Sequence, residues 1–147
     1  MLIASLPIAV VMERRMLRHR WADEAWSAIA VVADPGGMKL QQQDLSLRST
    51  QQWHLINGLQ LELHPDENDG YYENWIAPAP KVFVLWRMHG DRGLPVAASV
   101  SYVEGARMLD SGESADGVAM SPDIHGWLGD YLRHHYRPRS QAKGHSR

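Results

Sequence analysis

The chain contains no cysteine. This absence excludes disulfide bonds, metal sites built on thiolates, iron–sulfur clusters ligated by cysteine and catalysis by a cysteine nucleophile. A protein without disulfides is compatible with a reducing compartment, and we expect it in the cytoplasm. Phenylalanine is also scarce, with one residue, whereas the chain has six Trp and five Tyr. These amphipathic rings suit half-buried sheet faces and surfaces that bind partners.

The sequence has no long hydrophobic run. Residues 2–12 are the most apolar stretch near the start, and they are too few to span a bilayer. They carry no basic segment before them, contain Pro7, and lead directly into Glu13 without a small-residue cleavage site. We therefore expect neither a membrane segment nor an export signal.

Recognised catalytic and metal-binding motifs are missing as well. The eight His residues include no pair at i and i+4 on a helix and no His-x-His pair. Gly36 and Gly37 are not followed by the Lys-Ser or Lys-Thr of a phosphate loop, and no G-x-S-x-G elbow is present. The acidic segment 66–70 departs from the order of an EF-hand loop. The sequence thus predicts no catalytic residue, no metal site and no cofactor. A catalytic triad with a Ser nucleophile and a distant His stays an alternative, because its members need no fixed spacing.

Charge is nearly balanced overall but segregated along the chain. A formal net charge of −2 argues against nucleic-acid binding by global electrostatics. Nine of the fifteen Lys and Arg residues nevertheless fall in two places: Arg14, Arg15, Arg18 and Arg20, and Arg133, Arg137, Arg139, Lys143 and Arg147. The first group, beside Trp21, would suit an anion or an acidic partner segment. A solvated strand end explains it equally well.

Residues 53–88 carry the clearest secondary-structure pattern. Leu59, Leu61 and Leu63 alternate with polar residues, which indicates a half-buried strand. The polar segment 65–70 then predicts a turn into a strand over residues 71–76. Residues 82–86 are apolar at every position, a pattern typical of a central strand covered on both faces. Further strands are expected over residues 8–16 and 26–33, paired with each other, and over residues 95–101. Residues 38–50 lack an apolar stripe and are predicted to be a mobile connection.

The pair Asn57 and Gly58 allows two structures. A type I′ turn would make a hairpin here, because both residues tolerate positive φ. A continuous strand with a bulge at Gly58 is the alternative. With the hairpin register, His54 faces the leucines and His64 faces the other side, so the two imidazoles cannot share a metal.

Two helices are expected near the C-terminus. Ser101 and Glu104 have the spacing of a capping box, and Gly112 ends the first helix. Ser121 precedes a proline and starts the second, whose stripe recurs at helical spacing: Ile124, Trp127, Leu128, Tyr131 and Leu132. Together the patterns predict one α+β domain over residues 1–138. We expect an antiparallel, strongly curved sheet of about six to seven strands with the two C-terminal helices packed on one face. Residues 139–147 are predicted to be a disordered basic tail.

Several segments resemble one uncharacterised bacterial family, catalogued as domain of unknown function thirty-three-oh-five. The resemblance is carried by residues 62–67, 70–72, 82–87 and 100–102, by Glu104, Ala106, Arg107, Asp110, Gly112, Glu113 and Trp127, and by His135, Tyr136 and Pro138. Members of that family are often encoded beside genes for molybdenum- or tungsten-dependent formate dehydrogenases and their accessory factors. The resemblance implies a role in the assembly, delivery or regulation of such an enzyme, and it supplies no catalytic residues.

Two functions from different classes follow from these observations. The first is a non-catalytic accessory protein that binds a formate dehydrogenase subunit or maturation factor. The second is a domain that binds a small anionic ligand or cofactor, or an enzyme without a recognised motif; a homodimeric scaffold is a third expectation. The predicted partner-binding residues lie at a strand end and on a hairpin rim: Arg14, Arg15 and Trp21, and His64, Tyr71, Tyr72 and Trp75.

Overall fold

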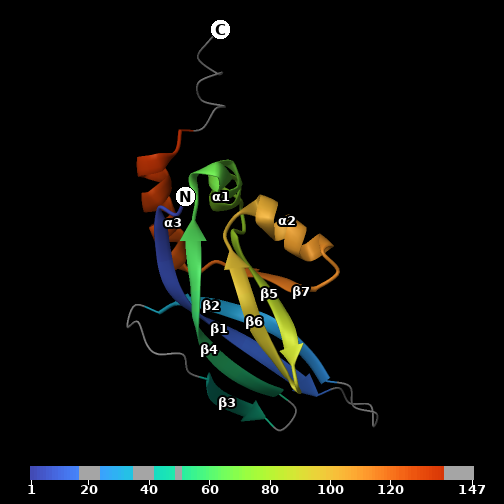
Figure 1. The fold of residues 1–147 in the computed structure, drawn as a ribbon. Helices are drawn as coiled ribbons and strands as arrows, with labels where there is room; N and C mark the ends of the chain where they lie inside the picture. The colour runs from blue at the N-terminus through green and yellow to red at the C-terminus, as the bar shows by residue number, and fades with distance from the viewer. Residues whose placement is uncertain (17–23, 35–41, 49–50, 138–147) are drawn as a thin grey trace.

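The computed structural model describes residues 1–16, 24–34, 42–48 and 51–137 (Figure 1). They form an α+β fold with two antiparallel sheets. The elements in chain order are β1 (Ala4–Met16), β2 (Glu24–Ala33), β3 (Gln42–Arg48), β4 (Gln51–Leu63), a short 3-10 turn (Pro65–Glu67), α1 (Asn68–Trp75), β5 (Lys81–His89), β6 (Arg92–Ser99), α2 (Tyr102–Asp110), β7 (Ser114–Ala119) and α3 (Pro122–His135).

The larger sheet has four strands in the order β2-β1-β4-β3. The predicted pairing of the first two strands is confirmed, because Val10 of β1 lies opposite Val31 of β2 in antiparallel register. Strand β1 begins at Ala4, four residues before the predicted start. The extra residues pair with the C-terminal half of β4, where Leu6 lies opposite Leu61.

Strand β4 runs straight through Asn57 and Gly58, so the hairpin prediction is wrong and the bulge alternative is confirmed. Opposite β1, the register moves from Ala9–Asn57 to Ile8–Leu59 and leaves Gly58 as the extra residue. Its φ of 104° is a backbone conformation that L side chains rarely adopt. His54 still lies on the buried side of the sheet, as the other register had also required.

Strand β3 replaces the connection that the sequence predicted over residues 38–50. Residues 42–48 pair with β4 from Ile56 down to Gln51. A strand can form here without an apolar stripe because the free edge of β4 supplies backbone hydrogen-bond partners. The remaining residues of the predicted connection, 38–41 and 49–50, lie outside the described part of the chain.

Residues 71–76, predicted to be a strand, belong mostly to helix α1. Asn68, Tyr71 and Asn74 recur at intervals of three residues and are all buried, which is the spacing of one helix face. Acidic side chains in the first turns, Asp66 and Asp69, favour the positive end of a helix. The two tyrosines and Trp75 therefore pack as a helix against α3 instead of forming a sheet.

The second sheet has three strands in the order β6-β5-β7, and β5 is central as predicted. Val82 and Val84 are fully buried on one face and Phe83 is buried on the other. Strand β7 was not predicted; its short sequence 114–119 has no apolar alternation. One strongly curved sheet is thus not what the chain forms, because the seven strands divide into two sheets that enclose a shared core.

The core lies between the two sheets. Side chains from both meet there: Ile8, Val10, Met12, Val31, Ile56 and Leu61 from the first, and Val82, Val84 and Val118 from the second. Asp116 of β7 links the two sheets. Its Oδ2 accepts from the Ala28 amide of β2 at 2.9 Å and from Trp86 Nε1 of β5 at 2.8 Å.

Helices α2 and α3 contact opposite faces of the three-stranded sheet, which corrects the prediction that both share one face. Gly105 of α2 lies directly against the ring of Phe83. Ile124 and Leu128 of α3 instead join the core on the face of Val82. Both predicted caps are present: Ser101 Oγ accepts from the Glu104 amide at 3.2 Å and Ser121 Oγ accepts from the Ile124 amide at 3.3 Å.

Candidate partner-binding surfaces

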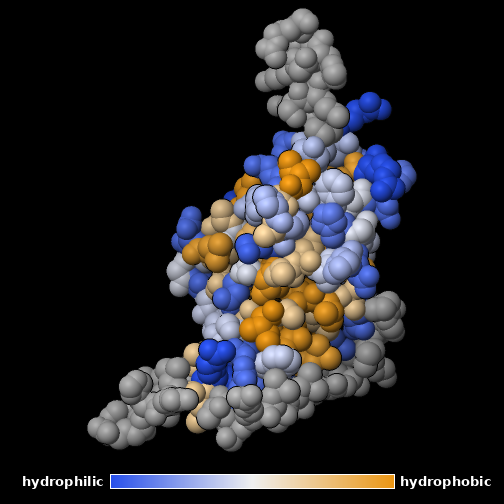
Figure 2. Space-filling view, turned by 180° about the vertical axis from the view of Figure 1, so that it is seen from behind, coloured by the Kyte–Doolittle hydropathy of each residue, from blue (hydrophilic) through white to orange (hydrophobic). Residues whose placement is uncertain are grey.

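The face of the four-stranded sheet that points away from the core is apolar. Residues paired across an antiparallel sheet point to the same side, so the register defines its rows. One row joins Ala30, Val11 and Leu55, and the next joins Val32, Ala9 and Asn57. We call these six residues the outer face; the side chains of the alternating rows enter the core. The space-filling view from behind shows apolar side chains gathered over these strands (Figure 2).

Solvent reaches four of the six residues of the outer face, whereas Ala9 and Asn57 are buried. Val32 keeps 41% of its surface exposed, and Val11, Ala30 and Leu55 are half-buried. None of these four side chains belongs to the hydrophobic core or packs against it. Contiguous exposed apolar surface on a folded domain is typical of a site where another macromolecule binds.

The predicted pair Arg14 and Arg15 is split by the strand. Arg14 points to the core side of the sheet, where its Nη1 donates to Gln52 Oε1 at 3.2 Å. Arg15 points to the outer side, its side chain is 59% exposed, and its Nη2 lies 3.5 Å from Glu13 Oε1. The adjacent residues therefore cannot form one basic patch, because successive side chains of a strand alternate. Trp21, the third member of that prediction, lies outside the described residues.

Glu13 borders the outer face and is held by three partners. Its Oε2 accepts from Gln51 Nε2 at 2.7 Å and from Trp53 Nε1 at 3.0 Å, and Arg15 supplies a positive charge. Burial alone would raise the pKa of the carboxyl group. The two hydrogen bonds and the Arg15 charge outweigh burial, and together they lower the pKa of Glu13 below its usual value.

This lowered pKa predicts a pH-dependent contribution to stability. A carboxylate whose pKa is depressed by folding stabilises the protein above its unfolded pKa, and this contribution is lost as pH falls through the folded pKa. Glu13→Gln should lower the free energy of unfolding by about 1 kcal/mol at pH 7. Urea titrations at several pH values should show the difference from wild type shrinking in acid. A difference that does not change with pH would contradict the assignment; Glu73→Gln, on the exposed side of α1, is the control.

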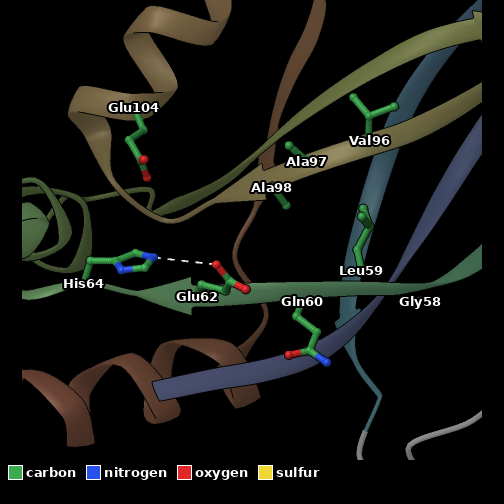
Figure 3. Close-up of a pocket in the computed structure, with 9 residues that line it drawn as sticks. All are labelled: Gly58, Leu59, Gln60, Glu62, His64, Val96, Ala97, Ala98 and Glu104. Atoms are coloured by element: carbon green, nitrogen blue, oxygen red, sulfur yellow. Dashed lines mark ion pairs between the residues drawn. The ribbon is translucent and has the colours of Figure 1, made fainter. Parts of the chain in front are cut away.

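A groove separates β4 from β6 (Figure 3). Its volume is about 520 Å³. Three elements line it: β4 with the residue that follows it (Gly58, Leu59, Gln60, Glu62 and His64), β6 (Val96, Ala97 and Ala98), and α2 (Glu104). Its carboxylates lie near His64 at one end, whereas Val96 and Leu59 lie at the other. His64 Nε2 is 3.6 Å from Glu62 Oε1.

The four residues of the predicted hairpin rim do not lie on one surface. His64 lies in the groove, but Tyr71 is fully buried, and its hydroxyl accepts from the His64 amide at 2.9 Å. Burial raises the pKa of the Tyr71 hydroxyl far above its ordinary value. Trp75 stacks on His125 with ring centroids 5.0 Å apart, and Tyr72 packs on Tyr136. These rings fix α1 to α3 and its C-terminal end, so of the four rim residues only His64 lines this groove.

Sequence reasoning missed both surfaces for the same reason. The outer face needs Val11, Val32 and Leu55 to be brought together from three strands, and the groove needs Glu104 from α2 to meet Glu62. One signal was available in the sequence: residues 8–12 are apolar at every position, so both faces of that strand present apolar side chains. Among the described residues, no three His, Asp or Glu side chains are grouped to hold a metal ion.

The comparison with family models places this chain. A model described as "Protein of unknown function (DUF3305)" matches residues 7–145. The chain belongs to this family. The match extends over both sheets and all three helices, so the outer face and the groove both lie within the family's domain. No curated protein and no solved structure matches the chain. None of the helices in the described residues has the length and apolarity needed to cross a bilayer.

Proposed function

We propose that this family member is a non-catalytic accessory protein that binds a partner protein through the outer face. The half-buried apolar row of Ala30, Val11 and Leu55, with the exposed Val32 beside it, is the observation that supports the proposal. Burying such side chains against a partner releases roughly 25 cal/mol for each Å² of apolar surface removed from water. A sheet face of this kind suits a protein surface, whereas small ligands generally bind in concave pockets.

Charge at the margin of the outer face indicates what the partner should present there. The Arg15 guanidinium is 59% exposed although it neighbours Glu13. It is therefore accessible to a carboxylate on a partner, and interfaces commonly place apolar contacts at the centre and charged contacts at the rim. The partner surface that fits is apolar, with an acidic residue at the margin opposite Arg15.

The partner we propose is a subunit or a maturation factor of a molybdenum- or tungsten-dependent formate dehydrogenase, in the cytoplasm. The support is the gene neighbourhood that the family resemblance implies. An accessory protein of this kind needs a binding surface and no reaction centre of its own. An anionic ligand such as a pterin pyrophosphate is disfavoured in the groove, because Glu62 and Glu104 in its lining would repel it.

The proposal is tested by co-expressing the tagged chain with the formate dehydrogenase subunits and maturation factors of its own source. Val32→Lys puts a charge into the outer face at a position that tolerates exposure. We expect wild type to capture one of these components and Val32→Lys to capture about tenfold less, because a buried unpaired charge opposes association. Arg15→Glu should weaken capture at low salt more than at high salt.

The matched control is Val103→Lys, which changes a valine of the same exposure, 41%, on helix α2 and outside the groove. It should leave capture at the wild-type level. Equal capture by wild type and Val32→Lys would rule out the outer face as the site. Recovery of none of these components at low or moderate salt would rule out the proposed partner. Light scattering that shows a dimer dissociated by Val32→Lys would assign the face to self-association instead.

A further inference from the structure

The groove between β4 and β6 is bordered by two strand edges that no described strand pairs with. Strand β6 is the edge of its sheet and pairs only with β5. Strand β4 pairs with β3 from Gln51 to Ile56, and no strand of the described residues pairs with that edge of β4 over residues 59–63. Backbone N–H and C=O groups along such an edge are available to an added strand.

Local irregularities limit where a strand could be added. Pro95 has no N–H to donate, and the register of β6 shifts beside it, between the partners of Leu85 and Trp86. Gly58 interrupts the edge of β4 in a similar way. Between Gly58 and the end of β4, residues 59–63 are regularly paired to β1 and contain no proline. Near the end of this stretch the Tyr71 hydroxyl donates to the Glu62 carbonyl at 3.4 Å and accepts from the His64 amide. A short, regular stretch of edge is left before that point, facing the groove.

The lining defines the charge of the segment that would fit. Glu62 and Glu104 approach the groove from different elements, and no Lys or Arg lines it. The side chain of Glu62 is 54% exposed, so a cation can reach it without displacing a buried partner. At the other end Leu59 and Val96 present apolar surface. The complement is an extended segment with a basic side chain at one end and apolar side chains at the other.

We propose that the groove binds a short, extended, Lys- or Arg-containing peptide segment of another protein, added as a strand along residues 59–63 of β4. The backbone of the added segment pairs with the free edge of β4, and its basic side chain meets Glu62 and Glu104. This site shares no residue with the outer face, so it would allow the chain to hold two different proteins or two parts of one.

Synthetic peptides test the proposal on the full chain. A fluorescent seven-residue peptide of alternating Lys and Val should bind, with affinity that falls as salt is raised. The Glu-Val peptide of the same length should not bind. The Lys-Val peptide with alternate backbone nitrogens methylated keeps its charge but cannot pair on one edge, and it should bind about tenfold more weakly. Amide NMR signals of residues 59–63 should shift when the unmethylated peptide is added.

Two variants locate the site. Glu62→Lys should weaken binding of the Lys-Val peptide about tenfold, because a carboxylate is replaced by a like charge. Val96→Lys should weaken it as well, which provides a second variant if Glu62→Lys fails to fold. Glu73→Lys makes the same charge change on the exposed side of α1, outside the groove, and should bind as wild type does.

Each outcome decides one part of the proposal. Equal binding by wild type, Glu62→Lys and Val96→Lys would show that the groove is not the site. Equal binding of the methylated peptide would show that the segment does not add as a strand. Binding of the Glu-Val peptide as well would remove the charge argument. Val32→Lys should bind the Lys-Val peptide normally, so the groove and the outer face can fail independently.

Discussion

Asn74→Ala is expected to lower the free energy of unfolding by about 3–5 kcal/mol. Asn74 is fully buried near the end of α1. Its Nδ2 donates to the Lys81 carbonyl at 2.7 Å and to the Val100 carbonyl at 2.8 Å, and its Oδ1 accepts from the Lys81 amide at 2.9 Å. One side chain thus ties the helix to the start of β5 and to the chain just after β6. Removing it leaves three backbone groups without these partners.

Equilibrium urea denaturation followed by circular dichroism measures this loss. Glu73→Ala is the control, because Glu73 is the preceding residue of the same helix and is exposed; its effect should stay within about 0.5 kcal/mol. Asn74→Asp keeps an acceptor for the Lys81 amide but loses both donors and adds a buried charge, so it should destabilise at least as much at pH 7. A loss below about 1 kcal/mol for Asn74→Ala would contradict the bridging role.

Gly105→Ala is expected to cost about 1–3 kcal/mol, although alanine ordinarily favours a helix. A Cβ at Gly105 would overlap the Phe83 ring and come within 2.6 Å of its Cε2. Phe83 is itself 4% exposed on the central strand β5, so the ring has little room to move. Helix α2 would have to shift away from the sheet to accept the methyl group.

Gly126→Ala in α3 is the matched control. A Cβ there meets nothing within 4 Å, so the substitution should raise the free energy of unfolding by about 0.5–1 kcal/mol through helix propensity alone. The double variant Gly105→Ala with Phe83→Leu separates contact from propensity. If overlap with the ring is the cause, the two changes should cost less together than the sum of each alone. Strict additivity would contradict the contact.

Three sequence signals were sufficient because the features they describe are local. Ser121 followed by Pro122 predicted the start of α3, and the stripe from Ile124 to Leu132 predicted its buried face. A cap is satisfied by amides a few residues away, and a helix face is set by a fixed period. The apolar run 82–86 identified the central strand of a sheet in the same way.

Other signals failed because they depend on distant partners. Gly58 fits both a hairpin and a bulge, and only the pairing of β4 with β1 selects the bulge. The sequence pattern predicted a strand at Tyr71 and Trp75. In the structure they belong to a helix whose rings contact Tyr131 and His125 of α3. Helix formation there is decided by tertiary packing more than by propensity. The basic pair was misplaced for a simpler reason, since Arg14 and Arg15 lie on one strand and point to opposite faces.

The sequence by itself determined an α+β chain without cysteine chemistry, the caps of its later helices and the strands richest in apolar residues. These features arise from composition and from contacts within a few residues. Tertiary structure alone decided that the strands divide into two sheets, that Val11, Val32 and Leu55 form a partly exposed apolar face, and that Glu62 and Glu104 line one groove. Surfaces of this kind are assembled from residues far apart in the chain, and no local period records which strand edges will meet.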